Sequence, residues 1–222
     1  MDGWRIERVT KDDTQEIYDL LIRSYYLEEP VTKHYVEMYG IPSIDQSLEM
    51  QALPQGLSFK LVSEDGKILA VSFNMDYRLL KNYKPEPNSA MEKIQTFFNF
   101  IDKKAGNLER HADGWLCILA GVVDNATRNR GIADVVVTEN EEECRRKGYK
   151  GIEVVCSSEY TSRLFAKRGY EHVFRYPYAS YTDADGKQIF NPTPPHDAIN
   201  VYIKRNEFYV PPTTEDSKSC RR

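Results

Sequence analysis

Hydrophobic and polar residues alternate in short blocks along the chain, and each block has the period of one kind of element. Residues 4–9 have the pattern of a strand. Residues 11–27 predict a helix, because Ile17, Leu20 and Leu21 fall on one face at helical spacing. The chain therefore starts with a strand followed by an amphipathic helix.

Pro30 interrupts this helix, and short helical patterns then give way to strand patterns. Residues 31–55 mix helical spacing with glycine and proline, which predicts one or two short helices that could form one wall of a pocket. Residues 57–63 and 67–77 flank an Asp-Gly turn. This pattern predicts an antiparallel hairpin, because Asp-Gly accepts the positive φ of tight turns.

Helical and strand patterns alternate again in the second half. Helical spacing of apolar residues predicts a helix over 89–104 whose aromatic stripe belongs to the core. An apolar run over 115–123 predicts a buried strand. The helix after it should turn Ile132, Val135 and Val136 inward. Its outer, solvated face is expected to hold the acidic residues Glu139, Glu141, Glu142 and Glu143.

The last elements complete an alternating order. A short buried strand is expected at 151–156, a helix at 158–168, and a closing antiparallel pair at 170–181 and 198–204. This order predicts an α/β fold with a central mixed, mostly antiparallel twisted sheet and helices on both faces.

Composition and charge narrow the class of protein. The chain has 222 residues and a formal net charge of -4, so a wide basic surface for nucleic acid is not expected. The sequence has no signal-peptide pattern and no apolar run long enough to span a bilayer. We therefore expect a cytoplasmic protein without membrane or nucleic-acid partners. Its single domain is expected over residues 1–210, before a polar tail at 211–222, as a monomer with a dimer as the alternative.

The cysteines and histidines do not have the spacing of a metal site. The four cysteines form no CxxC pair, which favours reduced thiols over a disulfide framework, and Cys117 and Cys156 lie in strand-like runs expected in the core. The four histidines are expected to be structural or surface residues, so no metal is expected. An acyl-cysteine intermediate is not favoured, because burial in an apolar strand raises the pKa of a thiol.

The connection between strand 115–123 and the next helix has the features of a phosphate-binding turn. It reads Arg128, Asn129, Arg130, Gly131, Ile132 and Ala133. Small residues let backbone N–H groups approach a phosphate, the helix N-terminus adds its dipole, and the arginines add charge. The alternative is an ordinary strand-to-helix connection with solvated arginines. The segment is neither a GxGxxG motif nor a P-loop.

This turn matches an Arg/Gln-x-x-Gly-x-Gly/Ala signature through Arg128, Gly131 and Ala133, and thereby resembles the GNAT acyltransferases. In that family the motif binds the pyrophosphate of acetyl-coenzyme A. The order of elements is also that of the GNAT fold, and Leu164, Phe165, Gly169 and Tyr170 echo a second family motif. The resemblance implies a GNAT fold with acetyl-CoA as cosubstrate.

The same resemblance implies which residues contact the cofactor. Val122 and Val123 lie where strands of this fold separate to admit the pantetheine arm, and a backbone N–H near them would stabilise the oxyanion. The other implied cofactor residues are Arg128, Asn129, Arg130, Gly131, Ile132, Ala133, Ser158 and Phe165.

A candidate general base lies where the first helix ends. Acyl transfer from a thioester to an amine requires removal of an ammonium proton, and Glu28 and Glu29 precede Pro30. Adjacent glutamates are usually solvated, so a surface pair is the alternative. The tyrosine-rich segment from Tyr25 to Pro30 resembles the insect arylalkylamine N-acetyltransferases, and this resemblance implies that Glu29 is the base.

Candidate proton donors follow strand 151–156. Ser157 and Thr161 match two serines that the same family assigns to a relay, although threonine at the second position adds a methyl group. Helix capping is the alternative role for both hydroxyls. Tyr160 is another candidate acid.

These residues favour acetyl transfer from acetyl-CoA to an arylalkylamine, such as dopamine, serotonin, tyramine, octopamine or histamine, by direct transfer in a ternary complex. One alternative is acetylation of another small amine or a polyamine, and the other is a catalytically silent acyl-CoA-binding module. The residues expected around the acceptor are Tyr25, Tyr26, Tyr35, Tyr39, Met75 and Tyr77.

Overall fold

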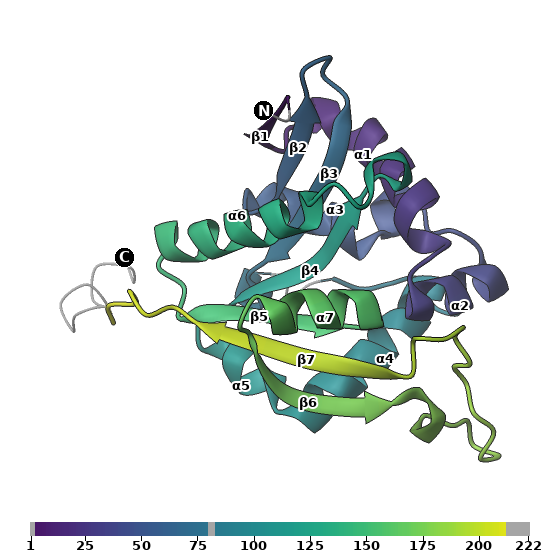
Figure 1. Ribbon diagram of the computed structural model, residues 1–222. Coiled ribbons are helices and arrows are strands. Elements are labelled where there is room, and N and C mark those ends of the chain that lie inside the picture. Colours follow the sequence, from purple (N-terminus) through teal and green to yellow (C-terminus); the bar gives the residue numbers. More distant parts are fainter. Residues whose placement is uncertain (1–2, 80–82, 212–222) are drawn as a thin grey trace, which may run out of the picture.

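The computed structural model describes residues 3–79 and 83–211, and it is built around one twisted sheet (Figure 1). The seven strands lie in the order β1-β2-β3-β4-β5-β7-β6. Only the β4–β5 pair is parallel, which confirms the predicted mixed, mostly antiparallel sheet. The strands are β1 (Trp4–Arg8), β2 (Phe59–Ser63), β3 (Ile68–Met75), β4 (Leu116–Val123), β5 (Gly151–Cys156), β6 (Glu171–Pro177) and β7 (Ala198–Arg205).

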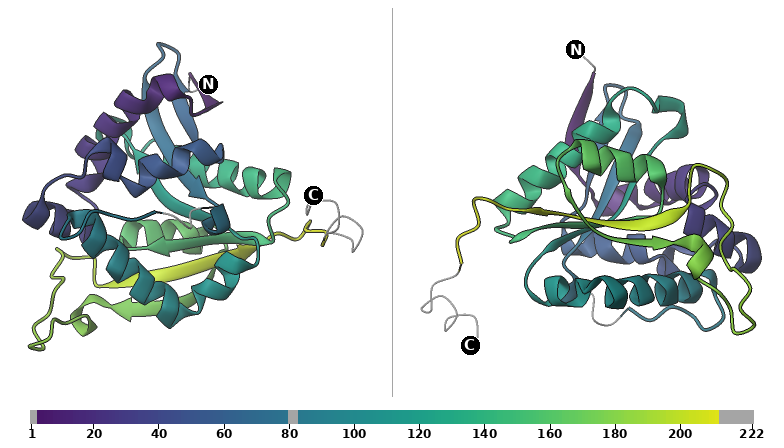
Figure 2. Two further views of the ribbon diagram at one scale, coloured as in Figure 1. Left: turned by 180° about the vertical axis from the view of Figure 1, so that it is seen from behind. Right: turned by 60° about the horizontal axis from the view of Figure 1, so that its bottom comes forward.

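Helices cover both faces of the sheet, as predicted (Figure 2). One face carries α1 (Thr14–Leu21), α2 (Pro30–Tyr39), α3 (Leu48–Ala52), α4 (Ala90–Ala105) and α5 (Asn107–Ala112). The other face carries α6 (Ile132–Arg146) and α7 (Glu159–Lys167). Among the residues that the structure describes, no helix is long and apolar enough to cross a membrane. Residues 212–222 of the expected tail lie outside the described residues.

The helix expected over 11–27 is not one regular helix. A 3-10 turn at Lys11–Asp13 precedes α1, and the chain continues as a π-helical turn at Ile22–Tyr26. Pro30 then starts α2 instead of merely ending the first helix, because the first position of a helix needs no N–H donor. The spacing of apolar residues alone does not predict that the backbone changes from an α-helix to a π-helical turn.

The core follows the predicted alternation of the strands. On the side of α1 to α4, the buried faces of Met91, Ile94, Phe97 and Ile101 pack against the sheet, so the aromatic stripe of α4 belongs to the core as expected. Ile118, Val154 and Cys156 point to the opposite face, toward α6 and α7. The buried Cys117 and Cys156 thiols also confirm the predicted core positions.

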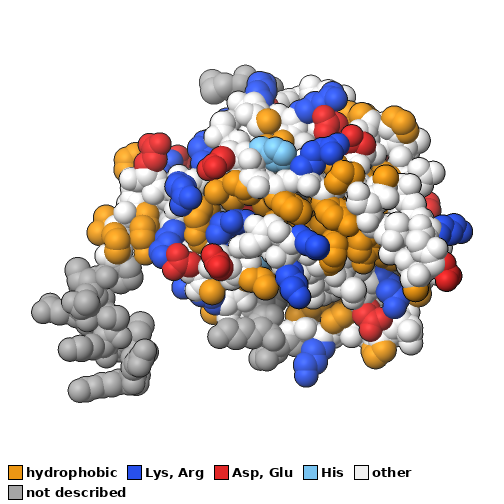
Figure 3. Space-filling view, turned by 90° about the horizontal axis from the view of Figure 1, so that it is seen from below, with side chains coloured by type: hydrophobic (Ala, Val, Ile, Leu, Met, Phe, Trp, Pro, Cys, Tyr) orange, Lys and Arg blue, Asp and Glu red, His pale blue; other side chains and the backbone are white. Residues whose placement is uncertain are grey.

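Strand β6 forms one edge of the sheet, and aromatic side chains fill the space between it and α4. Phe100 contacts both Tyr176, with ring centroids 5.2 Å apart, and Tyr181 at 5.3 Å. Figure 3 views this end of the molecule and shows a band of hydrophobic side chains with Lys and Arg side chains around it. Contact with α4 thus covers part of the apolar surface at this edge of the sheet, and other hydrophobic side chains remain exposed at this end of the molecule.

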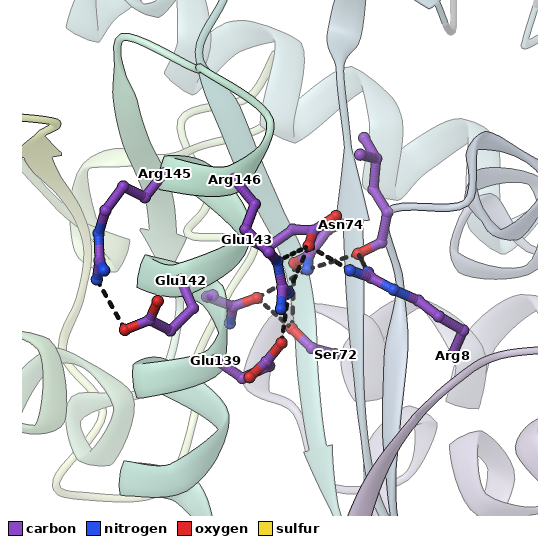
Figure 4. A network of polar contacts seen from close by, with 10 residues as sticks. Arg8, Ser72, Asn74, Glu139, Glu142, Glu143, Arg145 and Arg146 are labelled. Atoms are coloured by element: carbon purple, nitrogen blue, oxygen red, sulfur yellow. Dashed lines mark hydrogen bonds and ion pairs between the residues drawn. The ribbon is translucent and has the colours of Figure 1, made fainter. Parts of the chain in front are cut away.

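The prediction that Glu143 lies on the solvated face of α6 is wrong, because its side chain is fully buried between α6 and the sheet. Its carboxylate forms ion pairs with Arg8 of β1 and, at 2.6 Å, with Arg146 of α6 (Figure 4). Next to this pair, the amide of Asn74 donates to the side-chain oxygen of Asn140 at 2.7 Å. A polar face of a helix therefore packs against the sheet, where arginines pair with Glu143 Oε2 and Asn74 pairs with Asn140 Oδ1. Among the described residues, Glu143 Oε1 and Asn140 Nδ2 have no hydrogen-bond partner.

We predict that Glu143→Gln lowers the free energy of unfolding by about 1–3 kcal/mol at pH 7, because the ionised carboxylate accepts hydrogen bonds from two guanidinium groups. Burial raises the pKa of Glu143, but hydrogen bonds from Arg8 and Arg146 outweigh this effect and hold it below the usual value. The stabilisation is therefore full above the ordinary pKa of glutamate and disappears as pH falls through the lowered value.

Urea unfolding at several pH values measures this effect. The matched control is Glu142→Gln, which breaks an exposed pair with Arg145 and should change stability by less than about 0.5 kcal/mol. A loss that is the same at pH 3 and pH 7 would contradict the ionic explanation.

Candidate functional site

The parallel strands β4 and β5 pair over a short stretch and then separate. Residues 116–118 of β4 pair with residues 152–154 of β5, although β4 continues to Val123 and β5 to Cys156. The register between β3 and β4 also shifts here, so that Leu119 has no partner on β3, which marks a β-bulge. The bulge bends β4 away from β5, and a V-shaped opening results.

A cavity of about 660 Å³ lies at this opening, and residues from both faces of the sheet line it. Val137 of α6 and Phe165 of α7 line it on one face, while Tyr25 and Phe98 line it on the other. The cavity therefore passes through the sheet between the separated strands. Its size is that of a small-molecule site.

The connection from β4 to α6 forms one mouth of the cavity. Asn129 and Gly131 adopt positive φ values of 64° and 77°, and α6 begins at Ile132 without a side-chain cap on its N-terminus. No atom lies within 4 Å of the position that a Cβ on Gly131 would occupy. The first N–H groups of a helix have no partner within the helix, so this end can bind an anion.

The structure brings most of the predicted cofactor residues together, with two exceptions. The Val122 side chain is buried in the core on the α1 side, because it follows the bulge in β4, and Arg130 is exposed and does not line the cavity. The predicted cofactor residues that do line the cavity are Val123, Arg128, Asn129, Gly131, Ile132, Ala133, Ser158 and Phe165.

The two adjacent glutamates have different environments. Glu29 is half-buried, lines the cavity and caps α2, accepting hydrogen bonds from the main-chain N–H groups of Val31 at 3.2 Å and Thr32 at 2.6 Å. Glu28 is more exposed and forms an ion pair with Arg128 at 2.6 Å. The alternative of a solvated pair of surface glutamates therefore does not describe Glu29, which is half-buried and accepts two main-chain hydrogen bonds.

The charge of Glu29 reaches the tyrosine beside it. Burial, and then the carboxylates of Glu49 and Glu29, raise the pKa of Tyr25 well above its usual value. Glu49 is itself buried, where it accepts hydrogen bonds from Ser47 at 2.9 Å and Tyr26 at 3.1 Å. Burial raises the pKa of Glu49, which does not line the cavity, so Glu29 is the carboxylate next to Tyr25 that can attract a cation.

The three candidate proton donors after β5 all line the cavity. The N-cap of α7 is Ser158, whose hydroxyl accepts from the Tyr160 N–H at 3.2 Å, so capping is not the role of Ser157 or Thr161. Ser157 is buried, whereas the Tyr160 side chain is 63% exposed at the mouth. Among the described residues, the hydroxyls of Ser157 and Thr161 form no hydrogen bond, so both are available to a ligand.

Sequence reasoning missed two residues at this site. His196, expected to be structural or on the surface, lines the cavity, and its Nδ1 accepts the Glu159 N–H at 3.1 Å. A neutral His196 ring must then carry its proton on Nε2. Tyr178 is buried and donates its hydroxyl to the Ser157 carbonyl at 2.7 Å. Neither residue belongs to a recognisable motif, so only the packing of distant segments identifies them.

Most of the aromatic residues expected around the acceptor do not line the cavity. Only Tyr25 lines the cavity, whereas Tyr26, Tyr35 and Met75 are buried in the core. Tyr39 is 42% exposed, and Tyr77 stacks on His111 with centroids 3.9 Å apart. Phe98, Tyr160, Phe165 and His196 supply the other rings of the cavity.

A buried polar group holds the paired part of β4 and β5 just below the opening. Glu153 accepts hydrogen bonds from Arg110 at 2.5 Å and from His111 at 2.8 Å, opposite its cross-strand partner Cys117. Ligand atoms of His111, Cys117 and Glu153 lie within 4.8 Å of one another, an arrangement that their sequence spacing does not indicate. Because both carboxylate oxygens already accept hydrogen bonds, we interpret the group as an ion-pair network.

No family model matches the sequence. Solved structures with a similar fold are an agmatine N-acetyltransferase, at a TM-score of 0.78 and 21% identity over 92% of this chain and 100% of that chain, and arylalkylamine N-acetyltransferase 2 from Aedes aegypti, at 0.77 and 20% identity over 91% and 99%. A third is the polyamine N-acetyltransferase from Drosophila melanogaster, at 0.75 and 21% identity over 91% and 100%. At these identities the likeness concerns the architecture, and the chain therefore has the fold of the GNAT N-acetyltransferases.

Proposed function

We propose that the protein is an acetyl-CoA-dependent N-acetyltransferase that acts on arylalkylamines by direct transfer in a ternary complex. One observation carries the proposal. The cavity passes through the sheet and has an anion-binding helix N-terminus at one mouth, while Glu29 and aromatic rings lie on the other side. A nucleotide thioester and a cationic aromatic amine can then meet between β4 and β5.

The donor side offers the groups that a pyrophosphate requires. The open N-terminus of α6 presents main-chain N–H groups and the positive end of the helix dipole, and Arg128, which also pairs with Glu28, adds guanidinium N–H donors. The pantetheine arm would extend between β4 and β5, past the bulge at Leu119. A main-chain N–H on this open side of β4 would stabilise the oxyanion.

The acceptor side offers a base at a fixed position. Two main-chain hydrogen bonds hold the Glu29 carboxylate, and each oxygen keeps a further lone pair that can accept a proton from a substrate ammonium. The freed amine attacks the thioester carbonyl and the C–S bond breaks. A hydroxyl of Ser157, Thr161 or Tyr160 gives its proton to the departing thiolate and takes up the second proton of the attacking nitrogen, so that the products are the neutral amide and the thiol, with the first proton on Glu29. Because a thiol has a pKa of about 8.5, the donor assists without being indispensable.

The lining of the cavity favours an aromatic monoamine. Tyr25, Phe98 and Tyr160 supply rings for packing. Three carboxylates among the described residues line the cavity: Glu28 is paired with Arg128, and Asp134 lies in the first turn of α6. Glu29, next to Tyr25, is therefore the carboxylate placed to receive one ammonium group. The second candidate is acetylation of agmatine or a polyamine, which the similarity to an agmatine and a polyamine N-acetyltransferase favours.

Thiol release from acetyl-CoA tests the proposal directly. With purified protein, tyramine, dopamine or serotonin should give a kcat/KM at least about tenfold above that of agmatine or spermidine, a difference of about 1.4 kcal/mol in transition-state binding. The reverse preference would favour the second candidate. Thermal stabilisation by coenzyme A without release with any amine would instead indicate a silent binding module.

Replacing the base should separate chemistry from cofactor binding. We predict that Glu29→Gln lowers kcat by about 10²–10⁴ near pH 7, since the amide cannot accept the ammonium proton. Affinity for coenzyme A, measured by calorimetry, should change less than about twofold. Retained turnover in a folded Glu29→Gln protein would remove this residue from the mechanism.

A side chain at position 131 should weaken coenzyme A binding if the pyrophosphate contacts this turn. Gly131 and Gly186 have nearly the same φ, 77° and 79°, and neither has an atom within 4 Å of an added Cβ. Gly131→Val and Gly186→Val should therefore carry similar backbone strain. We predict that only Gly131→Val weakens coenzyme A binding, by about tenfold or more, in a calorimetric titration. Equal affinities of the two variants would overturn the assignment of this turn to the pyrophosphate.

A further inference from the structure

The main chain directly after β5 lies beyond the strand pairing on both sides. Pairing with β4 ends at Val154, and pairing with β7 ends at Cys156, so Ser157 is the first residue outside both ladders. Ser157 is buried, and a buried carbonyl needs a hydrogen-bond donor. The Tyr178 hydroxyl is that donor, at 2.7 Å from the Ser157 carbonyl oxygen.

Packing and main-chain bonds fix the place of Tyr178. Only 1% of its surface is exposed, and its ring centroid lies 5.5 Å from that of Phe190 and 6.5 Å from that of Phe97. Its main-chain N–H donates to the Asp197 carbonyl at 3.0 Å, next to the last pair of the β6–β7 ladder. The hydroxyl is therefore held at one position by the aromatic core and by the sheet.

Tyr178 can act only as a hydrogen-bond donor to this carbonyl. Burial, and then the charge of Glu29, raise the pKa of Tyr178 well above its usual value, so the hydroxyl keeps its proton at neutral pH. Tyr178 thus lies within the electrostatic range of the candidate base and in contact with the main chain of a candidate proton donor.

The reach of the Ser157 hydroxyl depends directly on its backbone. One torsion angle separates Oγ from the main chain, so the position of the backbone decides which atoms the hydroxyl can reach. Among the described residues this hydroxyl forms no hydrogen bond, and Ser157 lines the cavity. The bond from Tyr178 consequently determines where a free hydroxyl is presented to a ligand.

We propose, on the basis of the proposed function, that Tyr178 is a positioning residue for Ser157. It holds Ser157 where the hydroxyl can give its proton to the departing thiolate and take up the second proton of the attacking nitrogen. Tyr178 is absent from the described lining of the cavity, so it acts through the Ser157 main chain. Without its hydroxyl, the peptide of Ser157 would rotate toward another donor, and Oγ would move with it.

Single-turnover rates of acetyl transfer, measured with whichever amine is the better substrate, test this role without a contribution from product release. Tyr178→Phe keeps the ring and should lower the rate about tenfold, while the affinities for coenzyme A and for the amine change less than about twofold. The matched control is Tyr176→Phe, which removes a hydroxyl bond of 2.8 Å to the Ser180 carbonyl away from the cavity and should change neither quantity. Equal rates in the two variants would overturn the proposal.

A double-mutant cycle shows whether Tyr178 acts through Ser157. Ser157→Ala has no hydroxyl left to position, so adding Tyr178→Phe to it should change the rate less than about twofold. A further tenfold loss in the double variant would mean that Tyr178 acts on another group, and the proposal would be wrong.

Hydrogen exchange separates this proposal from the proposed function. Main-chain N–H groups of residues 157–162 should exchange about fivefold faster or more in Tyr178→Phe than in Tyr176→Phe, because the buried anchor of Ser157 is lost. Faster exchange supports the hold on Ser157 even if no amine is acetylated, in which case the proposed function alone fails. Unchanged exchange in Tyr178→Phe overturns that hold even if the protein acetylates tyramine.

Discussion

Three cross-strand pairs between β4 and β5 determine the geometry on which the cavity depends. If the two strands remained paired to their ends, the sheet would be closed and its two faces would be separate. The bulge at Leu119 ends the pairing on one side, and Glu153 with its partners Arg110 and His111 secures the paired part on the other. The opening therefore lies where β4 and β5 diverge, next to the part in which the two strands are paired.

Buried ionisable groups lie both near the paired part of β4 and β5 and between α6 and the sheet. Near the paired strands, burial raises the pKa of Asp102 to about 6, while the Asn107 amide donates to its carboxylate at 3.1 Å. Under α6, Glu143 relies on two arginines. Such groups cost free energy unless they are paired, so each favours one arrangement of the elements around it. The positions of the helices relative to the strands are consequently specified by polar contacts as well as by apolar packing.

The sequence predicts the element order, the mixed sheet and the strand-to-helix turn, because these depend on local periodicity and turn chemistry. It does not predict the burial of Glu143, since one of its two partners, Arg8, is distant in sequence and reaches it only in the folded chain. His196 and Tyr178 lie in the segment that connects β6 to β7, and no local sequence pattern predicts that this segment reaches the cavity region. The roles of Glu29, Ser157, Tyr160 and Thr161 remain predictions, although all four line one cavity.

The passage of the cavity through the sheet has a consequence for molecules that would occupy both of its sides. Two separate ligands can enter from opposite faces without displacing each other. A single molecule with a bulky group at each end has to thread one end between β4 and β5. For such a linked inhibitor, the width of the opening would limit the rate of association, while dissociation would require the same passage in reverse. Slow onset and long residence would then arise from the topology of the strands and not only from the strength of the contacts.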